Sequence, residues 1–197
     1  MVLILPFVAL IRGAIFVHHR YDNGPWISLA GGALLTVLIL FIYMTVIHGM
    51  FSSTLGSVRA FKRRFYVAVL MLAGYCIHAL FFISSSNLKN QSLQSELRQL
   101  HPIVRVAVST VIMIDPSLVI TDASRSQSDY RDMGLPVNER SLHFPQKDGY
   151  AYAIDLRTRD RSALRNVLLQ NYFRLMGFKT LHHGGTGPHL HISLKPA

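Results

Sequence analysis

Two histidines and an aspartate near the C-terminal end have the residue types and the order of a metal-binding set. His143 precedes Asp155 by twelve positions, and His191 closes the run Gly187-Pro188-His189-Leu190-His191. Imidazole and carboxylate groups are ordinary zinc ligands, and a site with three protein ligands leaves its fourth tetrahedral position to water, as in catalytic zinc centres. The set therefore predicts a catalytic Zn2+ site formed by His143, Asp155 and His191.

Short apolar segments and one amphipathic helix must position these side chains. Helical spacing of apolar residues predicts a helix over 162–176 that ends at Gly177. Residues 100–114 also have apolar residues close to helical spacing, but their β-branched content leaves helix or strand open. Short apolar runs predict strands over 118–121, 150–156, 178–181 and 189–194, and a loop with a helical turn over 126–140. Residues 100–197 are thus expected to form a small α+β domain, joined to the preceding part by a juxtamembrane linker over 87–99.

The first 86 residues have the composition of a membrane domain. Asp22 is their sole acidic residue, and the segments 27–50 and 65–83 contain no Lys, Arg, Asp or Glu. A transmembrane helix needs about 20 apolar residues, so both segments are expected to span the bilayer. Residues 2–17 are expected to form a third span or an interfacial piece, because Pro6 and Arg12 interrupt them.

Basic residues indicate the orientation of this membrane domain. Arg59, Lys62, Arg63 and Arg64 fall in the expected loop 51–64, and basic residues in short loops mark the cytoplasmic side. The C-terminal domain is therefore expected on the exoplasmic face of the cytoplasmic membrane, anchored by several spans in the lipid bilayer.

The overall formal charge of +10 does not by itself indicate nucleic acid. The C-terminal domain lacks a continuous basic stripe with interleaved aromatic residues, and its expected location is outside the cell, so no nucleic-acid partner is expected. An outward-facing basic domain would instead meet an anionic cell-wall polymer. The single cysteine, Cys76, lies in the last expected span, which excludes a disulfide or a cysteine-ligated metal in the C-terminal domain.

The ordered motifs of the C-terminal domain resemble the LAS-type zinc fold. That fold is shared by D-alanyl-D-alanine metallopeptidases, lysostaphin-related endopeptidases and the signalling domain of hedgehog proteins. The likeness covers roughly residues 98–195 and rests on four segments, Ser141-Leu142-His143, Ala153-Ile154-Asp155, Gly177-Phe178 and His189-Leu190-His191. It implies that His143, Asp155 and His191 bind zinc, and that Arg125 binds a substrate carboxylate.

The chain departs from this family at two places. The family's first two ligands are usually seven positions apart, and here the extra residues fall in the Pro- and Gly-containing stretch 144–149, which can bulge outward as a loop. Asp148 in this stretch is a weaker ligand candidate than Asp155. The carboxypeptidase branch has a glutamate base where this chain has Pro188, so His189 or His183 is expected to transfer protons, with His182 as a further candidate.

These features favour a membrane-anchored zinc peptidase that hydrolyses peptidoglycan stem peptides or crosslinks. Two other classes of function remain open at this point. A zinc-stabilised module could bind the cell wall without hydrolysis, in keeping with Pro188. Alternatively, the membrane half could form a pore or assist lysis, with the C-terminal domain as an appendage.

Overall fold

A computed structural model describes residues 4–52, 57–185 and 187–197 of the chain. The chain divides into two compact units, Met1–Phe82 and Ile83–Ala197. The first unit is helical, and the second combines helices with a small antiparallel sheet.

The first unit contains three helices, which are α1 (Leu5–Tyr21), α2 (Pro25–Ser52) and α3 (Val58–Phe81). Two segments are long and apolar enough to cross a membrane, Pro25–Phe51 with a mean hydropathy of 2.3 and Val58–Phe81 with 1.6. The two long apolar helices expected from the sequence are therefore present. The segment expected over 2–17 is the 17-residue helix α1, which ends with His18, His19 and Arg20 in its last turn.

Helix α3 starts earlier than the uncharged run 65–83 indicated. Arg59, Lys62, Arg63 and Arg64 were expected in the loop 51–64, but they lie in the first two turns of α3. The Ser57 side chain accepts a hydrogen bond from the Ala60 backbone N–H and so caps this extended start. Lys and Arg are good helix formers, so a cap is enough to carry the helix through them.

Small residues bring α1 and α2 into close contact. A Cβ atom placed on Gly32 would clash with the Leu10 carbonyl oxygen and would lie 2.7 Å from the Ala14 backbone nitrogen. A Cβ atom placed on Gly13 would lie 3.2 Å from the Gly32 Cα. Glycine lets two apolar helices approach through their backbones, which is the usual route to tight packing between helices in a membrane.

Substitution of Gly32 by alanine should therefore separate α1 from α2. We expect Gly32→Ala to destabilise the detergent-solubilised protein by about 1–3 kcal/mol, because the added methyl group meets backbone atoms. Gly74→Ala on α3 is the matched control, since no described atom beyond its own stretch of helix backbone lies within 4 Å of its virtual Cβ. Equal melting temperatures for the two variants would contradict the close approach.

The second unit has a four-stranded sheet in the order β1-β2-β4-β3, in which every neighbouring pair is antiparallel. Its strands are β1 (Ile120–Asp122), β2 (Ala153–Arg157), β3 (Lys179–His183) and β4 (His189–Ser193). Its α-helices are α4 (Leu93–Glu96), α5 (Pro102–Ile114), α6 (Gln127–Asp132) and α7 (Ala163–Met176), with short 3-10 turns η1 (Ser85–Asn87) and η2 (Leu97–Gln99).

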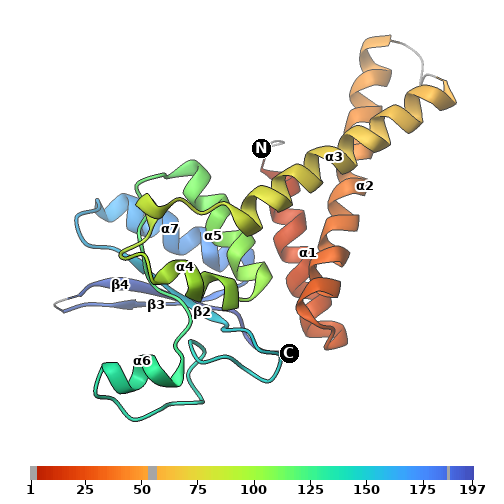
Figure 1. Ribbon diagram of the computed structural model, residues 1–197. Coiled ribbons are helices and arrows are strands. Elements are labelled where there is room, and N and C mark those ends of the chain that lie inside the picture. Colours follow the sequence, from red (N-terminus) through yellow and green to blue (C-terminus); the bar gives the residue numbers. More distant parts are fainter. Residues whose placement is uncertain (1–3, 53–56, 186) are drawn as a thin grey trace. The chain divides into compact units, whose positions relative to one another are not determined.

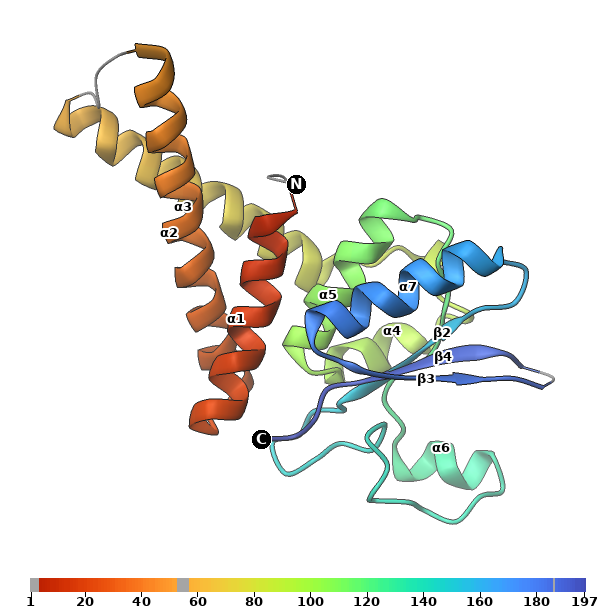
Figure 2. The same ribbon diagram turned by 180° about the vertical axis from the view of Figure 1, so that it is seen from behind.

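Helices cover one face of this sheet and leave the other to polar side chains. Figures 1 and 2 show α5 and α7 on one side of the strands and α6 on the other. The core on the helical side includes the fully buried side chains of Ile154, Leu156, Leu190, Ile192 and Phe173. Successive residues of a strand point to opposite faces, so Asp155, His189 and His191 lie on the face away from that core.

Most elements of the second unit match the expectations, with shifts at their ends. Helix α7 is capped by the Ser162 side chain and stops at Gly177, whose φ of 101° is the left-handed conformation that glycine adopts freely. Strand β2 begins at Ala153 rather than at Tyr150, because the Tyr152 N–H donates to the Leu142 carbonyl at 2.7 Å, outside the sheet.

Residues 87–99, expected as a linker, pack onto the second unit. Asn87 is only 3% exposed, and its Nδ2 donates to the Pro116 and Leu118 carbonyls, both at 2.8 Å. Leu88 forms a parallel bridge with Ile120 of β1. A buried side-chain amide with both donors satisfied fixes the chain at this point, so the folded part of the second unit starts well before residue 100.

Candidate metal centre

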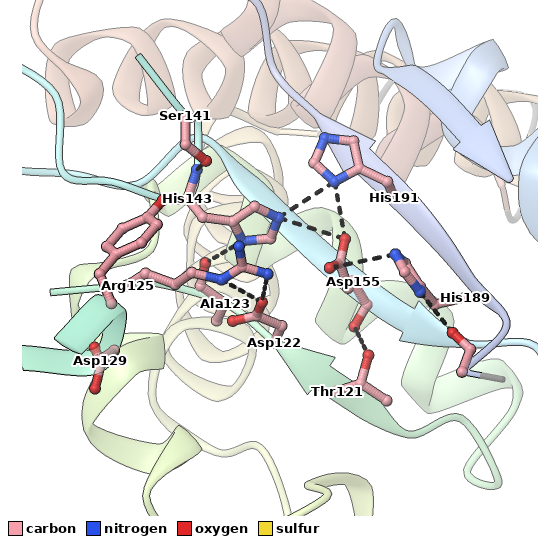
Figure 3. A network of polar contacts seen from close by, with 12 residues as sticks. Thr121, Asp122, Ala123, Arg125, Asp129, Ser141, His143, Asp155, His189 and His191 are labelled. Carbon is pink, nitrogen blue, oxygen red and sulfur yellow. Dashed lines mark hydrogen bonds and ion pairs between the residues drawn. The ribbon is translucent and has the colours of Figure 1, made fainter. Parts of the chain in front are cut away.

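The fold brings His143, Asp155 and His191 together from three separate segments. Asp155 comes from β2, His191 from its partner strand β4, and His143 from the loop before β2. The His191 Nδ1 lies 2.8 Å from Asp155 Oδ1, and the His143 Nε2 lies 3.4 Å from the same oxygen. The two facing imidazole nitrogens are 3.2 Å apart. Figure 3 marks these contacts with dashed lines.

These three atoms have the spacing that a single metal ion requires. All of them lie within 4.8 Å of one another, so the group could hold a metal ion. Ligands at about 2.0–2.1 Å from a tetrahedral zinc ion are about 3.3 Å apart, close to the separations in this group. His143 and Asp155 are buried and His191 is partly exposed, so an ion here would be reached from the side of His191.

The orientation of His143 is set by a neighbouring carbonyl. Its Nδ1 lies 2.6 Å from the Ala123 carbonyl oxygen, which can only accept, so the Nδ1–H donates. This keeps a proton on Nδ1 and makes Nε2 the nitrogen that faces Asp155 and His191. Metal-binding histidines generally show this second hydrogen bond, which holds the ring and raises its basicity. The His143 carbonyl in turn accepts the Arg125 N–H at 2.8 Å.

The extra residues between His143 and Asp155 form a hydrogen-bonded turn within residues 144–150. The Gln146 N–H donates to the Tyr150 carbonyl at 2.9 Å, and the Gly149 N–H donates to the Gln146 carbonyl at 2.8 Å. Asp148 is exposed, and its carboxylate accepts the Tyr152 hydroxyl at 2.8 Å. The stretch 144–149 therefore bulges as a self-bonded loop, and Asp148 is not part of the ligand group.

Charge and burial act in opposite directions on the ligand pKa values. Burial lowers the pKa of His143, but its hydrogen bond to Asp155 and the charge of that carboxylate outweigh burial and raise it above the ordinary value. Burial raises the pKa of Asp155, but hydrogen bonds from His143 and His191 lower it well below its usual range. The site without metal thus holds a proton on the histidine side of the group.

Metal binding must displace that proton, so zinc affinity should depend on pH. Because the pKa of His143 is raised, we expect the affinity to fall as the pH drops through that pKa, by up to about tenfold per pH unit for each proton released. Competition with a chromogenic chelator between about pH 5.5 and 8 measures the affinity. Calorimetry in buffers of different ionisation enthalpy counts the protons, and an affinity independent of pH would contradict this account.

The structure separates the three histidines considered for proton transfer. His189 is nearest, with its Nε2 3.6 Å from Asp155 Oδ2 and its Nδ1 donating to the Gly187 carbonyl at 2.8 Å. His183 pairs with His189 across the β3–β4 ladder, and the two rings stack at 4.7 Å. His182 pairs with the buried Leu190, so strand alternation directs it to the opposite face.

Arg125 lies beside the ligand group but is already engaged by a carboxylate. Its guanidinium forms a two-pronged contact with Asp122 Oδ2, in which Nε donates at 2.7 Å and Nη2 also donates. Its backbone N–H holds the His143 carbonyl, as described above. The backbone of Arg125 therefore helps to fix the loop that carries His143. Its guanidinium is bound by Asp122, which would compete with any substrate carboxylate.

Glu96 is a charged neighbour of this region that the sequence did not indicate. Burial is the main reason that its pKa is raised to about 7, and the nearby Asp122 raises it further, while a hydrogen bond from the Ala123 backbone lowers it. Glu96 thus lies near Ala123, whose carbonyl orients His143. The polar sequence around Glu96 gives no sign of this role. Only the fold brings Glu96 close to Asp122 and Ala123.

No protein-family model, curated protein or solved structure matches this chain. The resemblance to the LAS-type fold consequently rests on the residues of this chain alone. What the geometry defines is a site of two histidines and one aspartate, on the open face of a small antiparallel sheet, that could hold a metal ion.

Proposed function

We propose that this protein is a membrane-anchored zinc peptidase that hydrolyses peptidoglycan stem peptides or crosslinks outside the cytoplasmic membrane. The observation that carries the proposal is the convergence of His143, Asp155 and His191, whose ligand atoms lie within 4.8 Å of one another. Two imidazoles and one carboxylate suit zinc and leave room for a non-protein ligand, which is the donor set of catalytic zinc sites.

A bound zinc ion would supply Lewis-acid chemistry to a peptide carbonyl. The surrounding residues have distinct tasks in this proposal. The Ala123 carbonyl holds the ring of His143 in place. The Thr121 hydroxyl donates to the Asp155 carbonyl and so helps to fix the backbone of Asp155. The Nδ1 of His189 donates to the Gly187 carbonyl, and its Nε2 lies beside Asp155, so Nε2 can accept a proton and return it to the leaving amine. His183 stacks on that ring and supports its position.

The substrate class follows from the resemblance and from the expected location. The peptidase branches of the LAS-type fold act on peptides of the bacterial cell wall, and the ligand segments of this chain follow the same order. An exoplasmic domain anchored in the cytoplasmic membrane faces peptidoglycan directly. The excess of Lys and Arg over acidic residues in the chain suits a negatively charged wall polymer.

Metal content and wall digestion, measured on the same full-length protein in detergent, test the proposal. We expect one zinc per chain and released peptides for the wild type, and loss of both for His191→Ala. His189→Ala should keep zinc and lose most of its activity, since general acid–base groups contribute about 10²–10⁴-fold. His182→Ala is the matched control, because this histidine points to the other face of the sheet.

Full digestion by His189→Ala would remove the proton-transfer role from His189. Zinc bound without any digestion would favour the second candidate, a cell-wall binding module stabilised by zinc. The observation in favour of that candidate is Pro188, which replaces the carboxylate base of the carboxypeptidase branch. Absence of zinc from the wild-type protein would contradict both candidates.

The proposed orientation depends on the basic start of α3. Arg59, Lys62, Arg63 and Arg64 lie at the end of α3 that joins α2, and basic residues flanking a span remain on the cytoplasmic side. Helices α2 and α3 then form a hairpin whose connection is inside the cell. The chain after Phe81 consequently emerges on the outer side of the membrane.

Labelling of engineered cysteines in spheroplasts tests this orientation. Cys76 is the only cysteine, so a Cys76→Ser background allows single-site labelling with a membrane-impermeant maleimide. Ser128→Cys, an exposed position in α6, should react in intact spheroplasts. Ser57→Cys, at the start of α3, should react only after permeabilisation. The reverse pattern would place the metal site in the cytoplasm and exclude a peptidoglycan substrate.

A further inference from the structure

A basic cleft opens beside the metal centre on the sheet face that carries the ligands. It encloses about 440 Å³ and is bordered by Asp155 and His189 on the side of the metal site. Its charged lining also includes four cations, which are Lys89, Arg125, Arg157 and Arg159. The cleft is thus continuous with the candidate site, and its lining sets these four cations beside the carboxylates of Asp122, Asp155 and Asp160.

Arg157 occupies a defined position relative to the ligands. It follows Asp155 by two residues on β2, so both side chains leave the same face of the sheet. It lies directly opposite His189 in the β2–β4 register, two residue pairs along the strand from Asp155 and His191, which makes it the next pair on the same face. Its backbone N–H donates to the Val119 carbonyl at 2.9 Å, which fixes the strand at this point. Arg157 is therefore placed next to the site by the sheet itself.

The acidic residues of the cleft leave two of its four cations without an ion pair among the described residues. Asp122 is engaged by Arg125, and Asp155 is surrounded by the histidines. The exposed Asp160 lies 3.9 Å from Arg159. Across residues 4–52, 57–185 and 187–197, no carboxylate oxygen lies within the 4.0 Å ion-pair distance of a side-chain nitrogen of Arg157 or Lys89. Two cations in the cleft thus remain available to an anion.

The positive surface also continues away from the metal centre. A smaller hollow of about 230 Å³ shares Arg157, Arg159 and Asp160 with the cleft and adds Arg161 and Arg165. Arg161 is held by Asp115 at 2.5 Å, whereas Arg165 is exposed. An elongated ligand that starts at the metal site would therefore pass Arg157 first and then a mostly basic surface.

We propose that Arg157, assisted by Lys89, forms an anion subsite that binds a carboxylate of an acidic peptide substrate next to the bond that is cut. This inference rests on the proposed peptidase function. A guanidinium presents parallel N–H donors that match the two oxygens of a carboxylate, and it is always charged. The subsite is distinct from Arg125, whose guanidinium is occupied by Asp122.

Paired peptides test this subsite on the zinc-loaded full-length protein in detergent. One peptide is a fluorescently labelled stem peptide with free side-chain carboxylates, and the other is the same peptide with those groups amidated. Where the protein hydrolyses them, the ratio of kcat/KM values is the readout. Where it does not, the ratio of Kd values from fluorescence polarisation is used, so failure of the peptidase function is distinguished from failure of the subsite.

We expect the wild-type protein to prefer the acidic peptide by about tenfold, as charge-assisted hydrogen bonds allow. Arg157→Gln should bring this ratio close to one, and Arg157→Lys should restore part of it. Lys179→Gln is the matched control, because it removes one charge from an exposed position at the end of β3 away from His183. If Arg157→Gln does not fold, Lys89→Gln, at an exposed position, should lower the ratio instead.

Two results would overturn the subsite. One is a wild-type protein that binds or cleaves both peptides equally. The other is an equal loss of preference in Lys179→Gln, which would show that the overall charge of the protein, and not the cleft, selects the acidic peptide.

Discussion

The second unit depends on one buried carboxylate. Asp155 is only 5% exposed, and a buried charge is tolerated only when it is paired or bound to metal. Its Oδ1 faces His143 and His191, and its Oδ2 faces His189. Three histidines from a loop and a neighbouring strand are therefore directed at one side chain, and a metal ion would complete that group in place of the proton it holds. The need to pair the buried Asp155 carboxylate thus also brings the candidate metal ligands together.

The register between β2 and β4 converts this constraint into a site. Asp155 is opposite His191 and Arg157 is opposite His189, so ligands and cleft residues form two adjacent cross-strand pairs on one face. A slip of one residue would direct the ligands into the core beneath α5 and α7. The buried residues Ile154 and Leu190, which pack on the helical face, prevent that slip because they would be exposed by it. Core packing therefore protects the geometry of the metal group.

In the proposed function, the first unit would serve as the membrane anchor and the second unit would hold the catalytic site. In the first unit, glycine contacts between α1 and α2 and the basic start of α3 suit a membrane anchor of fixed orientation. In the second unit, the candidate ligand group is bordered by a cleft that contains Arg157 and Lys89. Among the described residues, neither of these two cations forms an ion pair with a carboxylate. Under the proposed function, an anchored domain with a Lewis-acid site and an anion subsite would suit acidic peptides held in a wall close to the membrane.

The sequence by itself determined the two long apolar helices and the small α+β domain, and it predicted the three residues that the fold brings together into a group that could hold a metal ion. These follow from composition, from periodicity and from residue types that are ordinary metal ligands. It did not place the start of α3, because capping by Ser57 outweighs the charge of the following residues. Only the tertiary structure decided that His182 faces away from the site, that Arg125 is held by Asp122, and that Glu96 and Arg157 lie near the ligands. Those facts depend on strand register and on contacts between distant segments, which local sequence does not encode.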